Sequence, residues 1–144
     1  MPREAVTAAL RRQVRERAHG LCEYCRFPVH FTNAAFHCDH LQPRKSGGKA
    51  ILENLAWSCS LCNAYKSIKT HARDPQTGRL VPLFNPRRHR WSQHFAWSED
   101  TLLIIGRTAI GRATGEALQL NRTELRNLRR VLHAAGEHPP VAQD

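Results

Sequence analysis

Two Cys-x-x-Cys pairs constrain the fold of this chain more than any other feature. They lie on either side of residues 26–58, and their members are Cys22, Cys25, Cys59 and Cys62. Thiolates at this spacing can occupy two corners of a metal tetrahedron, so two such pairs complete a closed shell of four sulfurs. The spacing therefore predicts a structural zinc site. Four unrelated buried cysteines and a redox pair are the alternatives, and the repeated spacing disfavours both.

The size and composition of the chain indicate a single small globular domain. It has 144 residues, of which 41% are hydrophobic, enough to bury a modest core. No apolar run approaches the roughly 18 residues of a membrane span, and the N-terminus lacks the apolar region of a signal peptide. We therefore expect a cytoplasmic protein, in which cysteines bind metal rather than form disulfides. The fifth cysteine, Cys38, is expected to be a small buried strand residue.

The charge of the chain indicates a nucleic-acid partner. The formal net charge is +10, and most of the excess is arginine, whose planar fork suits phosphate. A basic surface attracts nucleic acid and releases its counterions. A surface that serves only solubility is the alternative, and it is disfavoured when the charge is taken together with the cysteine pairs.

Hydrophobic periodicity and turn residues predict a mixed α+β chain. The first half is predicted to contain a helix over 3–19, a strand over 34–41, an extended return over 51–57 and a helix over 60–70. In this last helix one face should consist of Leu61, Tyr65 and Ile68, and another of Asn63, Lys66 and Ser67. The second half is predicted to contain a turn at 74–78, a strand over 80–84, a short helix over 89–95, a hairpin over 96–106, and helices over 108–120 and 123–135. We expect one domain over 1–144, with a core of about 20–71, an extension over 72–136 and a frayed tail over 137–144.

Polar residues with catalytic chemistry lie between and beside the two cysteine pairs. Asp39 and His40 end the predicted strand, and Asn54 and Asn63 follow. Oxygens of Asp39 and Asn63 are hard ligands suited to Mg²⁺ or Mn²⁺, which keep several waters and take phosphate oxygens. The imidazole of His40 titrates near neutrality and is the natural general base for water. Asn54 can bridge backbone groups and hold the loop that presents His40.

Adjacent residues of a flat strand point to opposite faces, so Asp39 and His40 would be separated there. Both can serve one site only where the strand twists or ends. Pro43 and the two glycines of the loop over 44–49 favour such an end. An isolated Asp-His pair usually consists of ordinary polar residues of the surface or core. The place of this pair between the two cysteine pairs favours the functional interpretation.

Four sequence blocks occur between Cys22 and Ser67: CEYC, DHLQPRKSGG, ENLAWSC and CNAYK. In this order and spacing they resemble the HNH endonuclease family. The resemblance implies an α+β fold with a ββα-metal, treble-clef-like core, bracketed by the structural four-cysteine zinc site and carrying flanking helices. It also implies that Asp39 and Asn63 hold the catalytic metal, His40 activates water and Asn54 orients the loop.

The activity implied by the resemblance is metal-dependent hydrolysis of phosphodiester bonds in DNA. His40 would deprotonate water, one Mg²⁺ or Mn²⁺ would bind the scissile phosphate, and the products would carry 5′-phosphate and 3′-hydroxyl ends. Double-stranded DNA is the expected partner. The stretches PLFNPRRHRWSQHFAW and IGRTAIGRATGEALQLN resemble a small stand-alone bacterial branch of the family, which implies a bacterial protein.

Several basic residues are candidates for phosphate contacts, although ordinary solvated lysines and arginines would look the same. Arg44 and Lys66 lie close in sequence to the predicted catalytic residues. A second set beside Trp91 comprises Arg87, Arg88 and Arg90, although a tryptophan here is more often a core residue than a stacking platform. The spacing of His37 does not make it a metal ligand, but it alternates onto the Asp39 side of the strand and so belongs among the residues to examine.

Two other functions remain compatible with these motifs. A non-catalytic zinc-ribbon module could bind nucleic acid and use Asp39 and His40 only as internal hydrogen-bond partners. An antibacterial effector or toxin nuclease would perform the same reaction in a different biological setting. Catalysis is favoured because the acid, the imidazole and both amides occur together, and a binding module needs none of them. The motifs do not specify target sequence, cleavage geometry or oligomeric state.

Overall fold

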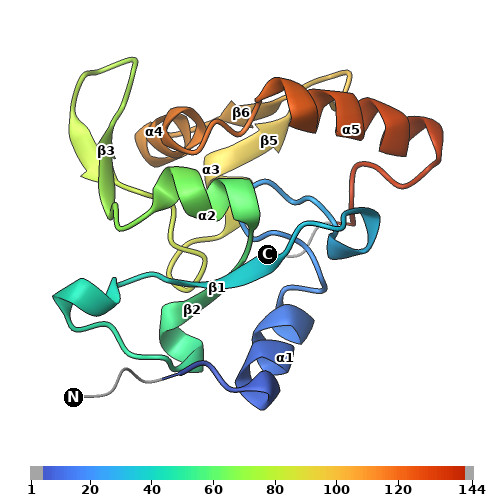
Figure 1. The fold of residues 1–144 in the computed structure, drawn as a ribbon. Helices are drawn as coiled ribbons and strands as arrows, with labels where there is room; N and C mark the ends of the chain where they lie inside the picture. The colour runs from blue at the N-terminus through green and yellow to red at the C-terminus, as the bar shows by residue number, and fades with distance from the viewer. Residues whose placement is uncertain (1–4, 142–144) are drawn as a thin grey trace. The chain divides into compact units, whose positions relative to one another are not determined.

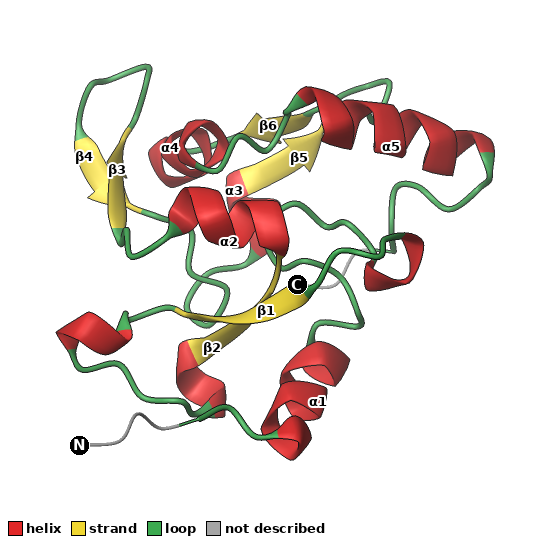
Figure 2. Cartoon of the chain, viewed as in Figure 1, coloured by secondary structure: helices red, strands yellow, loops and turns green. Residues whose placement is uncertain are grey.

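The computed structural model of the chain describes residues 5–141. Its fold is α+β, as predicted, with short antiparallel sheets and helices in both halves (Figure 2). The residues fall into two compact units. One comprises the chain up to Thr70 together with Asn85–Arg87, and the other comprises His71–Phe84 and the chain from Arg88 onward. No helix in the described range is long and apolar enough to cross a membrane.

The first unit is built around a ββα arrangement. Strands β1 (Phe36–His40) and β2 (Leu55–Cys59) pair antiparallel, and α2 (Ser60–Lys66) follows β2 without a break. Helix α1 (Ala8–Arg17) packs against β2, and α2 packs against both strands (Figure 1). The single-turn 3₁₀ helices of this unit are η1 (Val29–Phe31), η2 (Arg44–Ser46) and η3 (Leu52–Asn54).

The core of this unit lies between α1 and the two-stranded sheet. All five residues of β2 are buried, and Trp57 packs on Phe36 of β1 with ring centroids 5.3 Å apart. Val14 of α1 is fully buried. Arginines of α1 are also structural: Arg11 donates to the Phe36 carbonyl at 2.8 Å, and Arg17 donates to carbonyls of η3 and β2. The helix is thus held to the sheet by polar bonds as well as by apolar packing.

Helix α2 differs from the prediction in its length and in its buried face. It ends at Lys66 because Ser67 adopts φ 50°, a left-handed conformation that a helix cannot continue through. The predicted apolar face is exposed: Leu61, Tyr65 and Ile68 all lie at the surface. The buried residues are Cys62 and Lys66, four positions apart on one face. Sulfur and an ion pair, not aliphatic packing, therefore decide which face of α2 is buried.

The second unit contains two hairpins and three helices. Strands β3 (His71–Arg73) and β4 (Leu80–Pro82) form one hairpin, and β5 (Phe95–Trp97) and β6 (Ile104–Gly106) form the other. The helices are α3 (Trp91–His94), α4 (Ala109–Ala117) and α5 (Thr123–Ala134). Arg112 of α4 pairs through two nitrogens with the buried Asp74, which closes the turn between β3 and β4.

The predicted tail over 137–144 extends past the described residues, which end at 141. Within the described part, His138 is buried. Its ring packs edge-on against Trp97 with centroids 4.6 Å apart, and its Nε2 lies 2.7 Å from the Thr101 carbonyl oxygen. These contacts tie the start of this segment to the β5–β6 hairpin.

Candidate active site

The four cysteines of the two pairs meet in the first unit. All four are buried, and their Sγ atoms lie within 4.8 Å of one another. The Sγ atoms of Cys25 and Cys59 are 3.7 Å apart, which matches the edge of about 3.8 Å that a tetrahedron with Zn–S bonds of about 2.3 Å requires. The cluster could therefore hold a structural zinc ion with no position left for water.

The backbone around each pair supports anionic sulfur. The amide of Cys25 points at Cys22 Sγ at 3.5 Å, and the amide of Cys62 points at Cys59 Sγ at 3.4 Å. Arg26 turns the chain after the first pair with φ 63°. Burial raises the pKa of the Cys22 and Cys25 thiols, so their ionised forms need a positive charge at this place. A zinc ion supplies that charge.

The two residues inside the first pair anchor the sheet. Glu23 is buried, accepts a hydrogen bond from the Trp57 amide of β2 at 2.7 Å and pairs with Arg87. Tyr24 is fully buried, and its hydroxyl donates to Asp39 Oδ2 of β1 at 2.7 Å. Sequence reasoning missed both residues. A tyrosine between two buried ligands must itself be buried and must find a partner for its hydroxyl, so position alone could have indicated Tyr24.

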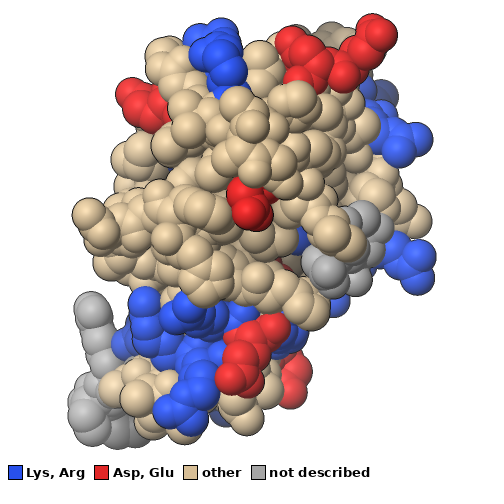
Figure 3. Space-filling view, turned by 90° about the vertical axis from the view of Figure 1, so that its right-hand side faces the viewer, with Lys and Arg blue, Asp and Glu red and all other residues tan. Residues whose placement is uncertain are grey.

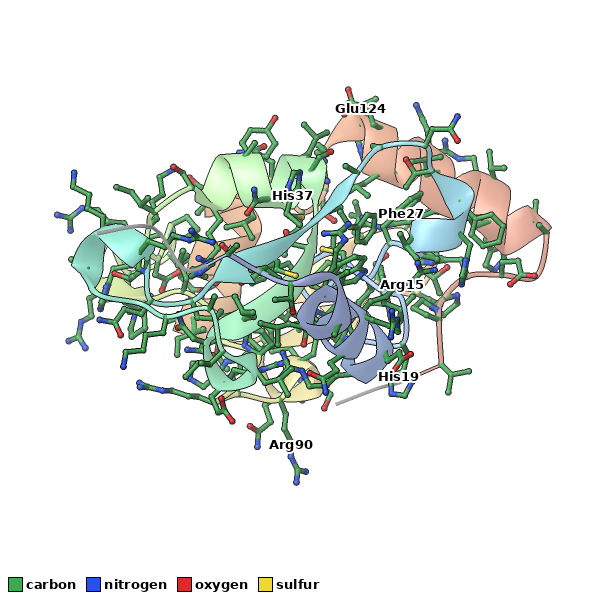
Figure 4. All side chains as sticks on the ribbon, turned by 60° about the horizontal axis from the view of Figure 1, so that its bottom comes forward. Arg15, His19, Phe27, His37, Arg90 and Glu124 are labelled. Carbon is green, nitrogen blue, oxygen red and sulfur yellow. The ribbon has the colours of Figure 1, made fainter. Side chains whose placement is uncertain are left out.

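A pocket of about 400 Å³ opens beside the end of β1. Three of the residues predicted to be catalytic line it: Asp39, His40 and Asn63. Arg11, Arg44 and His37 line it as well, and Figure 4 labels His37 on β1. The geometric obstacle of adjacent strand residues does not separate Asp39 from His40, because β1 ends at His40.

Asp39 is held from two sides in this pocket. Besides the Tyr24 hydroxyl, the Lys66 ammonium lies 3.0 Å from Oδ2. Both contacts fall on the same oxygen, and Oδ1 has no hydrogen bond to a described residue. Lys66 is only 2% exposed. The prediction that Lys66 contacts nucleic acid does not fit this position, because its ammonium is buried and paired with a carboxylate.

His40 is half-buried and accepts a hydrogen bond on its ring. Arg44 Nε donates to His40 Nε2 at 3.2 Å. Arginine can only donate, so Nε2 is the acceptor and the ring proton lies on Nδ1. The pKa of His40 is lowered, first by burial and then by the charge of Arg44. The imidazole is therefore neutral at physiological pH, with its lone pair on Nε2.

Asn54 secures the loop that follows His40. Its Oδ1 accepts from the Gln42 amide at 2.8 Å, and its Nδ2 donates to the carbonyls of Gln42 and Lys49 at 3.1 and 3.0 Å. The loop is closed so tightly that a Cβ on Gly48 would lie 1.7 Å from the Gln42 carbonyl oxygen. Only glycine fits there.

The segment 22–68 matches the family model described as HNH endonuclease. The match covers 47 of the 144 residues. The predicted family and the predicted ββα fold with a four-cysteine site are thereby confirmed. No curated protein and no solved structure matches the chain.

The basic residues that sequence reasoning grouped around Trp91 lie outside the matched segment 22–68, and they differ in their surroundings. Arg87 forms an ion pair with Glu23 and donates a hydrogen bond to the Leu55 carbonyl. Arg88 and Arg90 are exposed, and Arg90 extends away from the ribbon in Figure 4. Lys and Arg side chains gather at the lower end of the face drawn in Figure 3. On α1, Arg12 and Arg15 are exposed.

Proposed function

We propose that this protein is a metal-dependent endonuclease that hydrolyses phosphodiester bonds of double-stranded DNA. The observation that carries the proposal is the convergence of Asp39, His40 and Asn63 on one pocket of an HNH domain. An acid, an amide and a neutral imidazole are the groups needed to hold a hard cation and to activate water. A cluster of polar residues that served only the fold would not need to face a common cavity.

In this proposal His40 is the general base. Its Nε2 accepts a proton from water, while Nδ1 keeps its own proton. Asp39 and Asn63 hold the cation, for which Oδ1 of Asp39 is the unengaged oxygen. A bound Mg²⁺ or Mn²⁺ would polarise the scissile phosphate and stabilise charge on the leaving 3′-oxygen. The products carry 5′-phosphate and 3′-hydroxyl ends.

Arg44 has a second role in the proposal. Without substrate, its Nε occupies the Nε2 lone pair of His40, which is the atom that must receive the proton. A phosphate is a stronger acceptor for a guanidinium than a neutral imidazole, since the bond then joins two charged groups. DNA therefore draws Arg44 from His40 and frees the base. Exposed residues such as Arg44 can make this exchange without disturbing the core.

The zinc site acts structurally in this account. Four buried sulfurs leave no open coordination position, and the first cysteine pair carries the Tyr24 hydroxyl that contacts Asp39. The second pair ends at Cys62, directly before Asn63. The cysteines therefore set the positions of both oxygen ligands without taking part in the chemistry.

A plasmid cleavage assay tests the proposal. The zinc-loaded protein should nick or cut supercoiled plasmid with Mg²⁺ or Mn²⁺, and EDTA should stop the reaction. His40→Ala should abolish cleavage while DNA binding remains. His30→Ala is the control, because His30 is an exposed histidine of the same unit that does not line the pocket. Equal cleavage by wild type and His40→Ala across several divalent ions would refute the assignment of the base.

One observation favours a non-catalytic nucleic-acid-binding module as the second candidate. Asp39 is buried and already bonded by Tyr24 and Lys66, as it would be if its role were internal. The same assay separates the candidates, because such a module binds DNA but does not cut it, whichever divalent ion is added.

A further inference from the structure

The charge balance of the pocket is unusual for a cation site. Among its described lining residues Asp39 is the only carboxylate, and its charge is offset by Lys66 at 3.0 Å. The other charged groups that line it, Arg11 and Arg44, are positive. Asn63 contributes an uncharged amide. The empty pocket therefore presents net positive charge, which attracts phosphate and repels a divalent cation.

We propose that the catalytic cation and the substrate phosphate bind this pocket only as a pair, and that Lys66 enforces this coupling by neutralising Asp39. The identity of the phosphate donor as DNA rests on the proposed function. Lys66 is a positioning residue here: it touches neither substrate nor cation. A scissile phosphate supplies the negative charge and the oxygen ligands that the protein withholds.

The structure makes this neutralisation permanent rather than incidental. Lys66 is 2% exposed and Asp39 is 5% exposed, so neither can turn into solvent without opening the unit. Lys66 Nζ has no hydrogen-bond acceptor among the described residues apart from its ion-pair partner. Removing either member of such a pair leaves a buried charge uncompensated. Burying the Lys66 ammonium beside a proposed metal ligand costs desolvation free energy. A helix position with a purely structural role would not require a buried charge.

The contacts also fix which carboxylate oxygen a cation can use. Tyr24 and Lys66 both occupy Oδ2, so only Oδ1 is left for a metal. Asn63, one turn before Lys66 on α2, supplies a second, neutral oxygen. Two protein oxygens carrying little net charge make a weak site for Mg²⁺ or Mn²⁺, which normally require six ligands. Water and phosphate oxygens must complete the shell.

The coupling is measured first with His40→Ala, which keeps both proposed ligands and leaves DNA uncut. Fluorescence anisotropy gives the dissociation constant of a labelled duplex oligonucleotide with and without Mn²⁺ at constant ionic strength. We expect Mn²⁺ to tighten DNA binding at least about tenfold. By thermodynamic linkage, DNA then tightens Mn²⁺ binding by the same factor. The same measurement on the double variant with Asp39→Asn is the control, and it should show no tightening. An equal dissociation constant with and without Mn²⁺ in His40→Ala overturns the proposal.

The role of Lys66 is measured without DNA. Electron paramagnetic resonance titration of Mn²⁺ compares wild type with Lys66→Met, which keeps the length of the side chain and removes its charge. At a separation of about 6 Å, repulsion between a divalent cation and an ammonium on the far side of one carboxylate corresponds to about a tenfold change in affinity, even at the permittivity of water. Lys66→Met should therefore bind Mn²⁺ at least about tenfold more tightly, and Lys66→Arg should not. Unchanged or weaker binding by folded Lys66→Met overturns the role of Lys66.

The two tests separate this inference from the proposed function. If Lys66→Met fails to fold, as judged by circular dichroism and zinc content, the anisotropy measurement decides. If wild type cuts no DNA but Lys66→Met gains Mn²⁺ affinity, the charge coupling stands and DNA is the wrong substrate. In a third outcome, wild type cuts DNA, Mn²⁺ leaves DNA binding by His40→Ala unchanged, and Lys66→Met binds Mn²⁺ no more tightly than wild type. In that case the nuclease assignment stands and the coupling is wrong.

Discussion

Asn54 offers the sharpest test of how the loop beside the proposed base is held. Its side chain makes three hydrogen bonds to the backbone of residues 42 and 49, and its own backbone carbonyl accepts from the Leu41 amide at 2.9 Å. Asn54→Ala removes the first three bonds and keeps the fourth. The variant therefore separates the effect of the side chain from that of the chain path.

The structure sets the expected size of the effect. A net hydrogen bond contributes about 1 kcal/mol, and these three lie partly in solvent, so we expect a total loss of about 2 kcal/mol. That corresponds to about a thirtyfold rise in the open population of the loop. Because the loop begins two residues after His40, cleavage should fall by up to about thirtyfold as the loop opens and the base is misplaced. Asn54→Asp should behave similarly at neutral pH, since it sets a carboxylate against the carbonyls of Gln42 and Lys49.

Amide hydrogen exchange measured by NMR reads the loop directly. The Gln42 amide should lose about thirtyfold in protection in Asn54→Ala, while the Leu41 amide, bonded to the backbone of Asn54, should change much less. Equal protection of the Gln42 amide in wild type and variant would refute the proposed role of Asn54. So would a uniform loss at both amides, because it would indicate general destabilisation instead of release of the loop.

Three further predictions concern the metal, the loop and the base. Cys59→Ser should lose bound zinc and much of its thermal stability, whereas Cys38→Ser, outside the cluster, should keep both; zinc analysis and calorimetry decide. Gly48→Ala should destabilise the unit by several kcal/mol in denaturant titration, since its Cβ meets a backbone oxygen at 1.7 Å. The base must be neutral to act, and the pKa of His40 is lowered by burial and by Arg44. The cleavage rate should therefore be maximal at neutral pH and decline only below about pH 6.5. Arg44→Ala should move this decline to higher pH in a pH–rate profile, and an unmoved profile would contradict the contact.

The four-cysteine cluster and the ββα order were predictable because they depend on short-range spacing. Two residues between cysteines fix the geometry of each pair, whatever the rest of the chain does. The strand over 34–41 and the return over 51–57 appear as β1 and as η3 followed by β2, and the helix at Ser60 begins where it was expected. Local pattern is sufficient for these elements because the pairing partner is close in sequence.

The environment of Asp39 could not be predicted in the same way. The burial of Lys66 depends on a carboxylate 27 positions earlier in the chain, and no local pattern reports such a partner. Periodicity instead favoured Leu61, Tyr65 and Ile68 as the buried face, which is wrong because the sulfur cluster draws Cys62 inward and Lys66 with it. Strand β3 was missed for a related reason: His71–Arg73 has no strand-like alternation and is extended only through its pairing with β4.

The central claim is that sulfur and oxygen sites are separate, with zinc in the first and the catalytic cation in the second. A crystal structure of His40→Ala with duplex DNA and Mn²⁺, with anomalous maps above and below the zinc edge, tests it most directly. We expect zinc among the four cysteine sulfurs, and manganese between Asp39 Oδ1, Asn63 and a phosphate oxygen. Manganese at the cysteines, or a DNA phosphate bound in the pocket with no cation beside Asp39, would contradict it.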